Sequence, residues 1–414
     1  MDHFNYQHHV LYAENVCLKE IIEKVGSPCY VYSAATLTRH YQVFDAAFKD
    51  QPHKICYAVK ANSNLAVLNL LASLGAGFDV VSQGELMRVI AAGGDPRQVV
   101  FSGVGKRPDE IAFALKHNIY CFNVESLAEL DCIQKIAHHL NVCAPIALRI
   151  NPDIDAKSHP YVVTGLKESK FGITYEDAIT AYKKAADLAN IQIKGLDYHI
   201  GSQLVELSPF IEAIHRMNEL ILKLQSFGIT LQHLDIGGGL GVVYQTETPP
   251  LPDEYASAIL KNCPYPELTL IIEPGRAIAA NAGILITQIL YLKESTHKNF
   301  CIVDAGMNDL LRPALYSAWQ EIIPIEQTQQ KEAIIYDVVG PVCESGDFLG
   351  KNRLLSIKQG DYLAVRSAGA YGFVMSSNYN TRPRIAEVMV KDRQYKIVRE
   401  RETIEHLYRN EHIW

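Results

Sequence analysis

The chain has 414 residues, 48% of them hydrophobic, which exceeds the size of one typical compact domain and predicts two. Its 39 basic and 46 acidic residues give a net charge of −7, which argues against nucleic acid or an anionic membrane as the main partner. Nine cysteines without a CxxC pair indicate reduced thiols and a cytoplasmic location, and the histidines show no metal-ligand spacing. We expect neither a signal peptide nor a spanning helix.

Eight short segments of β type alternate with helical patterns in the first two thirds of the chain. They are residues 55–61, 78–82, 99–103, 120–124, 146–151, 196–201, 233–238 and 268–275. Most are continuous apolar runs, as is typical of strands that are buried on both faces. The pattern predicts a (β/α)8 barrel over residues 26–280, because strand number and even spacing favour it over the alternative, a doubly wound open sheet.

Residues 281–414 are rich in β-type segments and lack long amphipathic helices, so we predict a C-terminal all-β domain. The basic residues between Arg393 and Arg401 are interrupted by other residue types and indicate the solvated face of a hairpin. Residues 1–25 form an N-terminal segment that we expect to pack with the β domain, with the option of an added strand.

Polar residues and glycines stand where four of the predicted barrel strands end, and barrel enzymes carry their chemistry at those ends. The residues are Lys60, His199 with Ser202, Asp235 with the glycines 237–239, and Glu273 followed by Pro274, Gly275 and Arg276. Each has an ordinary explanation by itself, such as a solvated lysine, a tight turn or a surface ion pair. Four such positions at one mouth favour a functional site.

The strand-end lysine and the glycine-rich segment GGGLG (237–241) together favour pyridoxal 5'-phosphate (PLP) as a cofactor. The segment lacks the dinucleotide pattern, but glycine N–H groups suit a phosphate, and barrels often bind phosphate after the seventh and eighth strands. Lys60 can form a Schiff base with the cofactor aldehyde. Glu273 can pair with a protonated pyridine nitrogen, and His199 can stack on the ring.

Several motifs follow one another along the chain in a fixed order. They are YAVKAN (57–62), HIGSQ (199–203), GGGLG (237–241), EPGR (273–276), DAGMNDLLRPALY (304–316), GPVCESGD (340–347) and GAYGF (369–373). In this order they resemble the fold-type III PLP-dependent decarboxylases, and within that fold most of all the diaminopimelate decarboxylase family. The resemblance implies decarboxylation of meso-2,6-diaminopimelate to L-lysine and CO2, the last step of lysine biosynthesis.

The resemblance also implies a role for each matching residue. Lys60 would be joined covalently to PLP, His199 would stack on its ring and Glu273 would pair with its pyridine nitrogen. Around the cofactor would lie Ser202, Gly239, Pro274, Gly275, Arg276 and Tyr371. Cys343 would return a proton to the substrate. Cys343, Glu344 and Tyr371 would enter the site of the opposite protomer, so the active protein would be a homodimer.

The second amino-acid group of diaminopimelate needs partners of both charges. Arg276 and Arg312 can bind its carboxylate through bidentate hydrogen bonds, Glu344 can pair with its ammonium, and Tyr316 and Tyr371 can add hydroxyl groups.

Decarboxylases of ornithine or lysine face a distal ammonium without a carboxylate, so arginine favours diaminopimelate. A decarboxylase for another basic amino acid or a carboxylated polyamine is the alternative, and a non-catalytic regulatory protein of the same fold is a third hypothesis. Asp79, Asn123, Arg149 and Lys170 have no assigned role at this stage.

Overall fold

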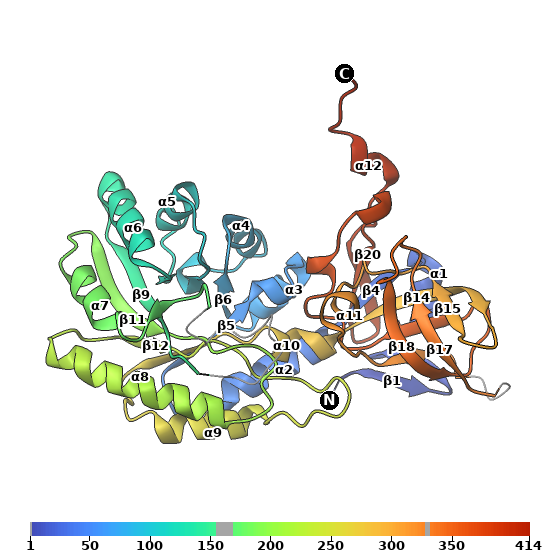
Figure 1. Ribbon diagram of the computed structural model, residues 1–414, viewed down its shortest axis with the longest axis horizontal. Helices are drawn as coiled ribbons and strands as arrows, with labels where there is room; N and C mark the ends of the chain where they lie inside the picture. The colour runs from blue at the N-terminus through green and yellow to red at the C-terminus, as the bar shows by residue number, and fades with distance from the viewer. Residues whose placement is uncertain (1, 155–168, 328–331) are drawn as a thin grey trace. The chain divides into compact units, whose positions relative to one another are not determined.

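A computed structural model of the chain describes residues 2–154, 169–327 and 332–414 (Figure 1). The chain divides into two compact units. The barrel unit comprises His40–Val242 and Thr248–Ala277, and the β unit comprises Met1–Arg39, Val243–Glu247 and Ile278–Trp414. The domain boundaries expected after residues 25 and 280 stay a prediction. None of the helices in the described ranges is both long and apolar enough to cross a membrane.

The barrel unit is a closed ring of parallel strands. In chain order the strands are β5 (His53–Ala58), β6 (Gly77–Val80), β7 (Val99–Phe101), β8 (Cys121–Val124), β9 (Ala144–Asn151), β11 (Ile191–Asp197), β12 (His233–Asp235) and β13 (Thr269–Ile272). Each strand pairs with the next, and β13 pairs with β5, so the ring closes. A short strand, β10 (Ile173–Thr174), adds to β9. The predicted barrel is confirmed, and the open sheet is excluded.

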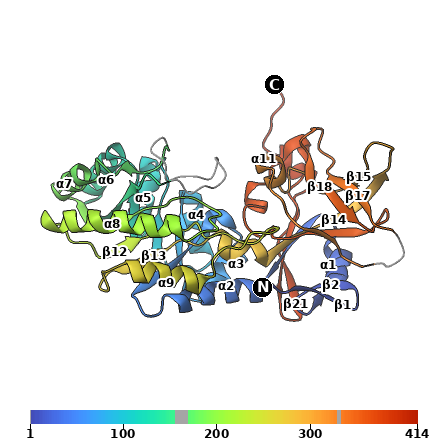
Figure 2. The same cartoon turned by 60° about the horizontal axis from the view of Figure 1, so that its bottom comes forward.

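Helices surround this ring (Figure 1). They are α3 (Leu65–Ser73), α4 (Gln83–Ala91), α5 (Pro108–Lys116), α6 (Leu127–Leu140), α7 (Ala178–Ala186), α8 (Ser208–Ser226) and α9 (Pro252–Asn262), and α8 and α9 pack side by side (Figure 2). Local sequence explains their ends. The hydroxyl of Ser82 accepts a hydrogen bond from the N–H of Glu85 and so begins α4, and Gly93 follows it with a φ of +83°.

Several barrel strands end earlier than the sequence predicts. β5 ends at Ala58, and Lys60 therefore lies in the 3-10 turn η1 (Val59–Ala61) instead of in the strand itself. β13 ends at Ile272, directly before Glu273. The physical reason is that the chain must turn away from the ring at its mouth. At this turn the N–H of Ala58 donates a hydrogen bond to the carbonyl of Pro274 (3.3 Å), which joins the two segments where they leave the barrel.

The β unit contains two sheets. The smaller consists of β1 (Phe4–Gln7), β2 (Val10–Ala13) and β3 (Val16–Cys17), followed by helix α1 (Leu18–Val25). The larger has the order β18-β17-β15-β14-β4-β20-β21, with β16 and β19 attached through β14. These strands are β4 (Cys29–Ser33), β14 (Gly283–Lys293), β15 (Phe300–Val303), β16 (Ile322–Pro324), β17 (Ile334–Val339), β18 (Phe348–Leu355), β19 (Tyr362–Val365), β20 (Ala386–Lys391) and β21 (Gln394–Arg399).

One apolar core joins the N-terminal segment to the larger sheet, because Leu11, Leu18 and Ile21 lie in the same buried cluster as Ile284 and Val388. The β-rich region after residue 280 is confirmed, and the basic residues near its end lie on the predicted hairpin, formed by β20 and β21. The unit also contains the start of helix α2 (Ala34–Ala47), the end of the short α10 (Arg276–Ala279), and the short helices α11 (Arg312–Tyr316) and α12 (Ile404–Tyr408).

His233 is a fully buried imidazole at the start of β12. Its ring lies 5.4 Å from that of Tyr120, and neither ring nitrogen has a hydrogen-bond partner among the described residues. A Cβ atom on Gly195, its register partner on β11, would lie 2.2 Å from Nε2, so only glycine fits there. Burial, with Lys194 and Lys54 nearby, lowers the pKa of His233 to about 3.

This lowered pKa predicts a pH-dependent stability. Between its ordinary pKa of 6.5 and about 3, the unfolded chain binds a proton at His233 that the folded chain does not bind. The residue therefore removes stability as the pH falls, by about 1.4 kcal/mol per pH unit. We expect the free energy of unfolding of His233→Phe to decline less steeply with acid than that of the wild type. Urea unfolding at several pH values measures both slopes, and equal slopes would contradict the prediction.

Candidate active site

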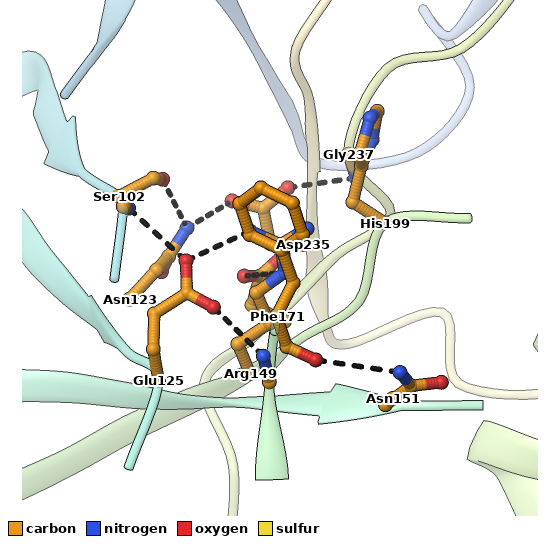
Figure 3. Close-up of polar contacts among 12 residues, drawn as sticks. Ser102, Asn123, Glu125, Arg149, Asn151, Phe171, His199, Asp235 and Gly237 are labelled. Atoms are coloured by element: carbon orange, nitrogen blue, oxygen red, sulfur yellow. Dashed lines mark hydrogen bonds and ion pairs between the residues drawn. The ribbon is translucent and has the colours of Figure 1, made fainter. Parts of the chain in front are cut away.

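Buried polar side chains from the carboxyl ends of several strands gather inside the barrel (Figure 3). They are Asp79 on β6, Asn123 on β8, Arg149 on β9, Asp197 on β11, Asp235 on β12 and Glu273 after β13, and the most exposed of them is 7% exposed. Parallel strands bring their carboxyl ends to one mouth, which explains how residues so far apart in sequence meet. Sequence reasoning placed Asp235 and Glu273 here and left the others unassigned.

Asn123 donates hydrogen bonds to two of these carboxyl groups. Its Nδ2 lies 3.2 Å from Oδ2 of Asp235, 3.4 Å from Oε1 of Glu273 and 3.2 Å from the hydroxyl of Ser102 (Figure 3). A neutral amide that donates to both carboxyl groups holds them close without adding charge.

This buried cluster contains more acidic than basic side chains, and the pKa values of its carboxyl groups are raised. Burial, followed by the charge of Asp235, raises the pKa of Glu273 well above its ordinary value. Burial also raises the pKa of Asp235 to about 7 and that of Asp197 well above its usual range. Oδ1 of Asp79 and Oδ1 of Asp197 have no hydrogen-bond partner in the described ranges. A cationic nitrogen beside Glu273 would therefore be stabilised, because it supplies the charge that the cluster lacks.

Lys60 presents its amine to this cluster from the turn after β5. Its Nζ lies 2.5 Å from Oδ2 of Asp79, and the lysine side chain is 39% exposed whereas the carboxylate is fully buried. Gly275 allows this turn to pack closely, since a Cβ there would lie 3.0 Å from the Cβ atoms of Ala58 and Ala61. The amine is thus oriented by a buried carboxylate and remains accessible to a ligand.

The glycine-rich turn holds His199. The N–H of Gly238 donates to Nδ1 of His199 (3.1 Å), and the N–H of Gly237 donates to Oδ1 of Asp235 (2.9 Å; Figure 3). Gly237 has a φ of +65°, and a Cβ on Gly238 would lie 2.3 Å from the carbonyl oxygen of Glu273, so larger residues do not fit. Burial, with the charges of Arg149 and Lys60, lowers the pKa of His199 well below its ordinary value, and the ring is neutral.

Ser202 and Arg276 meet beside this turn. Nη2 and Nε of Arg276 donate to the hydroxyl of Ser202 at 3.1 and 3.3 Å, and the arginine is 8% exposed. Gly239 has a φ of +118°, and a Cβ there would lie 2.8 Å from the carbonyl oxygen of Gly201. The residues predicted to surround a phosphate in the barrel unit therefore include one buried guanidinium, one hydroxyl and a turn that admits only glycine.

Glu125 and Ser102 belong to the cluster but were missed from the sequence. Glu125 accepts hydrogen bonds from Nη1 of Arg149 (2.8 Å) and from the N–H groups of Gly103 (3.1 Å) and Gly172 (2.8 Å). Arg149 also lies 4.9 Å from the ring of Phe171. The available signal was position, because Ser102 and Glu125 directly follow β7 and β8, and residues after barrel strands line the mouth. Lys170, in contrast, is exposed.

The other predicted residues belong to the β unit. Arg312 begins α11, is 7% exposed and places its guanidinium 4.4 Å from the ring of Tyr244; Tyr316 ends the same helix. Cys343 is exposed, and its N–H donates to Oδ1 of Asn380 (2.9 Å). The carboxylate of Glu344 accepts a hydrogen bond from the hydroxyl of Tyr379. Tyr371 has a φ of +55°, in the left-handed region.

Comparison with known proteins places this site in a family. Residues 34–280 match the pyridoxal-dependent decarboxylases, pyridoxal binding domain. The chain is 59% identical to the diaminopimelate decarboxylase of Vibrio cholerae, across 100% of this chain and 99% of that protein. The chain belongs to the diaminopimelate decarboxylase family. Its cofactor is accordingly pyridoxal 5'-phosphate, and the buried acidic cluster and the glycine-rich turn fit that group.

Solved structures agree with membership of the diaminopimelate decarboxylase family. The diaminopimelate decarboxylase of Helicobacter pylori complexed with L-lysine is 45% identical, with a TM-score of 0.92 over 95% of this chain and 98% of that chain. A lysine/ornithine decarboxylase of Vibrio vulnificus complexed with putrescine shares the fold with a TM-score of 0.79, at 25% identity over 91% of this chain and 97% of that chain.

The ion pair between Arg149 and Glu125 yields a stability prediction. Arg149→Met leaves a buried carboxylate without its cation, which costs about 3–5 kcal/mol of unfolding free energy. Arg107→Met is the matched control, because Arg107 pairs with Asp109 at the surface and its loss should leave stability unchanged. Urea unfolding followed by circular dichroism measures both variants. Equal stabilities would show that the buried pair contributes nothing.

Proposed function

We propose that this protein is a PLP-dependent carboxy-lyase that converts meso-2,6-diaminopimelate into L-lysine and CO2, the last step of lysine biosynthesis. The observation that carries the proposal is the 59% identity to a diaminopimelate decarboxylase along the whole chain. The L-lysine in the related Helicobacter pylori structure has the chemistry of the proposed product. The buried acidic cluster and the accessible amine support the same conclusion from the geometry.

The cofactor would be held by residues of the barrel unit. Lys60 is the proposed covalent attachment, Glu273 the partner of the pyridine nitrogen, and His199 the ring that stacks on the cofactor. The proposed phosphate neighbours are Ser202, Gly239, Pro274, Gly275 and Arg276, with Tyr371 added from the β unit. When bound, PLP accepts the electron pair left behind by the departing carboxylate.

The residues of this chain then govern orientation and protons. Glu273 keeps a proton at the pyridine nitrogen, because the acidic residues around it favour a cation there. The neutral His199, held through Nδ1 by Gly238, would stack on the cofactor ring without adding charge. Lys60 would hold the cofactor covalently through the amine that Asp79 orients. Cys343 donates a proton to the substrate carbon that has lost its carboxylate, and preorganised groups lower the barrier.

Specificity would come from the far end of the substrate. Arg276 and Arg312 are the proposed partners of the distal carboxylate, Glu344 of the distal ammonium, and Tyr316 and Tyr371 add hydroxyl groups. The contact between Arg312 and the ring of Tyr244 supports this assignment, since it fixes the guanidinium before substrate arrives. A buried guanidinium favours a substrate with a distal carboxylate over ornithine or lysine.

We also propose a homodimer in which Cys343, Glu344 and Tyr371 of one copy complete the site of the other. Cys343 and Glu344 are exposed, which supports this arrangement because residues that enter the site of a second copy must lie at the surface of their own. A cytoplasmic location is proposed as well. All nine cysteines lie in described parts of the chain and are free thiols, which suits a reducing compartment.

A CO2-release assay tests the activity. We expect the PLP-loaded protein to release CO2 from meso-diaminopimelate and far less from L-lysine, L-ornithine or L-arginine, because only the first carries the distal carboxylate. Lys60→Ala should abolish the release together with the visible absorbance band of the bound cofactor. Turnover of ornithine with none of diaminopimelate would instead support a decarboxylase for another basic amino acid.

Mixing of two inactive variants tests the shared site. Lys60→Ala and Cys343→Ala each remove one half of the proposed site, so neither homodimer should be active. After exchange of subunits, half of the dimers are mixed and each of these has one intact site, which restores about a quarter of wild-type activity. Activity measured against the mixing ratio checks this. No recovery, with subunit exchange proven by differently tagged copies, would contradict the shared site.

A further inference from the structure

The loop that carries Cys343 and Glu344, residues 340–347, is anchored at its base by Asp347. The two carboxylate oxygens of this 4% exposed residue accept hydrogen bonds from the N–H groups of Met307 (2.6 Å) and Val342 (2.7 Å). A Cβ on Gly340 would lie 2.5 Å from both Oδ2 of Asp347 and Cα of Gly306, so the backbone packs without any room for a side chain. The base of the loop is therefore fixed on the segment 304–309.

The tip of the loop is held by a second element, the 3-10 turn η6 (Tyr379–Thr381). Oδ1 of Asn380 accepts a hydrogen bond from the N–H of Cys343 (2.9 Å), and the hydroxyl of Tyr379 donates to the carboxylate of Glu344. Cys343 is exposed, so few packing contacts determine where its thiol stands. The hydrogen bond to its backbone is thus a main constraint on its position.

The turn that provides these contacts is strained. Asn380 has a φ of +54° and Thr381 a φ of +55°, both in the left-handed region. Asparagine tolerates this region, but a β-branched threonine rarely adopts it. Backbone strain of this kind persists only where the surroundings impose it, and it gathers at functional sites.

The surroundings do impose this conformation. The N–H of Ser377 donates to the carbonyl of Asn308 (2.9 Å), and Nη2 of Arg382 donates to the carbonyl of Asp304 (2.6 Å), so both ends of the turn are tied to segment 304–309. Asp347 ties the cysteine loop to the same segment. Turn and loop therefore share one base, which keeps Asn380 and Cys343 in register with each other.

We propose that Asn380 and Tyr379 are positioning residues, Asn380 for the thiol of Cys343 and Tyr379 for the carboxylate of Glu344. This inference rests on the proposed function, in which Cys343 donates a proton and Glu344 binds the distal ammonium. Neither positioning residue touches the reacting atoms in this scheme. Each acts through a single hydrogen bond to the residue that does.

Two substitutions of Asn380 distinguish the effect of losing its hydrogen bond from the effect of changing the backbone conformation. Asn380→Gly keeps the left-handed conformation at no steric cost and removes the acceptor, whereas Asn380→Asp keeps an oxygen acceptor. We expect Asn380→Gly to lower kcat for meso-diaminopimelate about tenfold with KM unchanged, since one hydrogen bond is lost. Asn380→Asp should restore kcat to near the wild-type value. Tyr379→Phe should instead raise KM severalfold, because it frees Glu344.

Thiol alkylation provides a readout that is independent of turnover. Cys343 and Cys143 are the two exposed cysteines, so the iodoacetamide labelling rate of Cys343, divided by that of Cys143 and measured by peptide mass spectrometry, reports on the loop alone. We expect this ratio to change in Asn380→Gly and to stay at the wild-type value in Asn380→Asp. A variant that had merely unfolded would also become labelled at the buried cysteines, such as Cys56 and Cys121.

The proposal is overturned if Asn380→Gly keeps both the wild-type kcat and the wild-type labelling ratio, or if Asn380→Asp is as impaired as Asn380→Gly. Cys343→Ala separates this outcome from failure of the proposed function. Full lysine formation by Cys343→Ala would remove Cys343 as proton donor, while the labelling ratio would still decide whether Asn380 positions the thiol.

Discussion

The buried surplus of acid at the mouth of the barrel is the constraint on which the site depends. Parallel strands deliver Asp79, Asp197, Asp235 and Glu273 to a region with little water, and the nearby cations balance them only in part. Burial raises the pKa values of Glu273 and Asp235, so their ionised forms need a cation nearby. The mouth is therefore prepared for a cationic ring nitrogen, which a pyridoxal-dependent family brings with its cofactor.

The neighbouring groups follow from that constraint. Asp79 orients the amine of Lys60, and Asn123 spaces two carboxyl groups through one amide. The glycine-rich turn contributes its N–H groups to Asp235 and to a neutral His199, and its lack of side chains lets it approach the backbone after β13. The charged groups, the amine and the imidazole ring are thus linked by hydrogen bonds among residues that follow different strands.

The β unit holds two exposed groups in place, the thiol of Cys343 and the carboxylate of Glu344. It does so with one segment, 304–309, which anchors both the cysteine loop and the turn at Tyr379–Thr381. The segment leads directly into α11, so Arg312 shares the same base. Residues that are separate motifs in the sequence therefore form one connected support.

The sequence by itself determined the eight strands, the β-rich region after residue 280 and the family, because strand patterns and short motifs are local properties of a chain. It also indicated Lys60, His199, Asp235 and Glu273, since position after a strand is readable without knowing the neighbours. It did not reveal that Lys60 lies in a turn, which depends on the contact between Ala58 and Pro274.

Only the tertiary structure decided the partners of Asn123, Glu125 and Asn380. Asn123 meets a carboxyl group 112 positions later, and Asn380 meets the N–H of a residue 37 positions earlier. An ordinary asparagine or glutamate carries no local signal of such a partner. Ring closure and loop packing create these pairs, and the burial that shifts their pKa values exists only once the chain has folded.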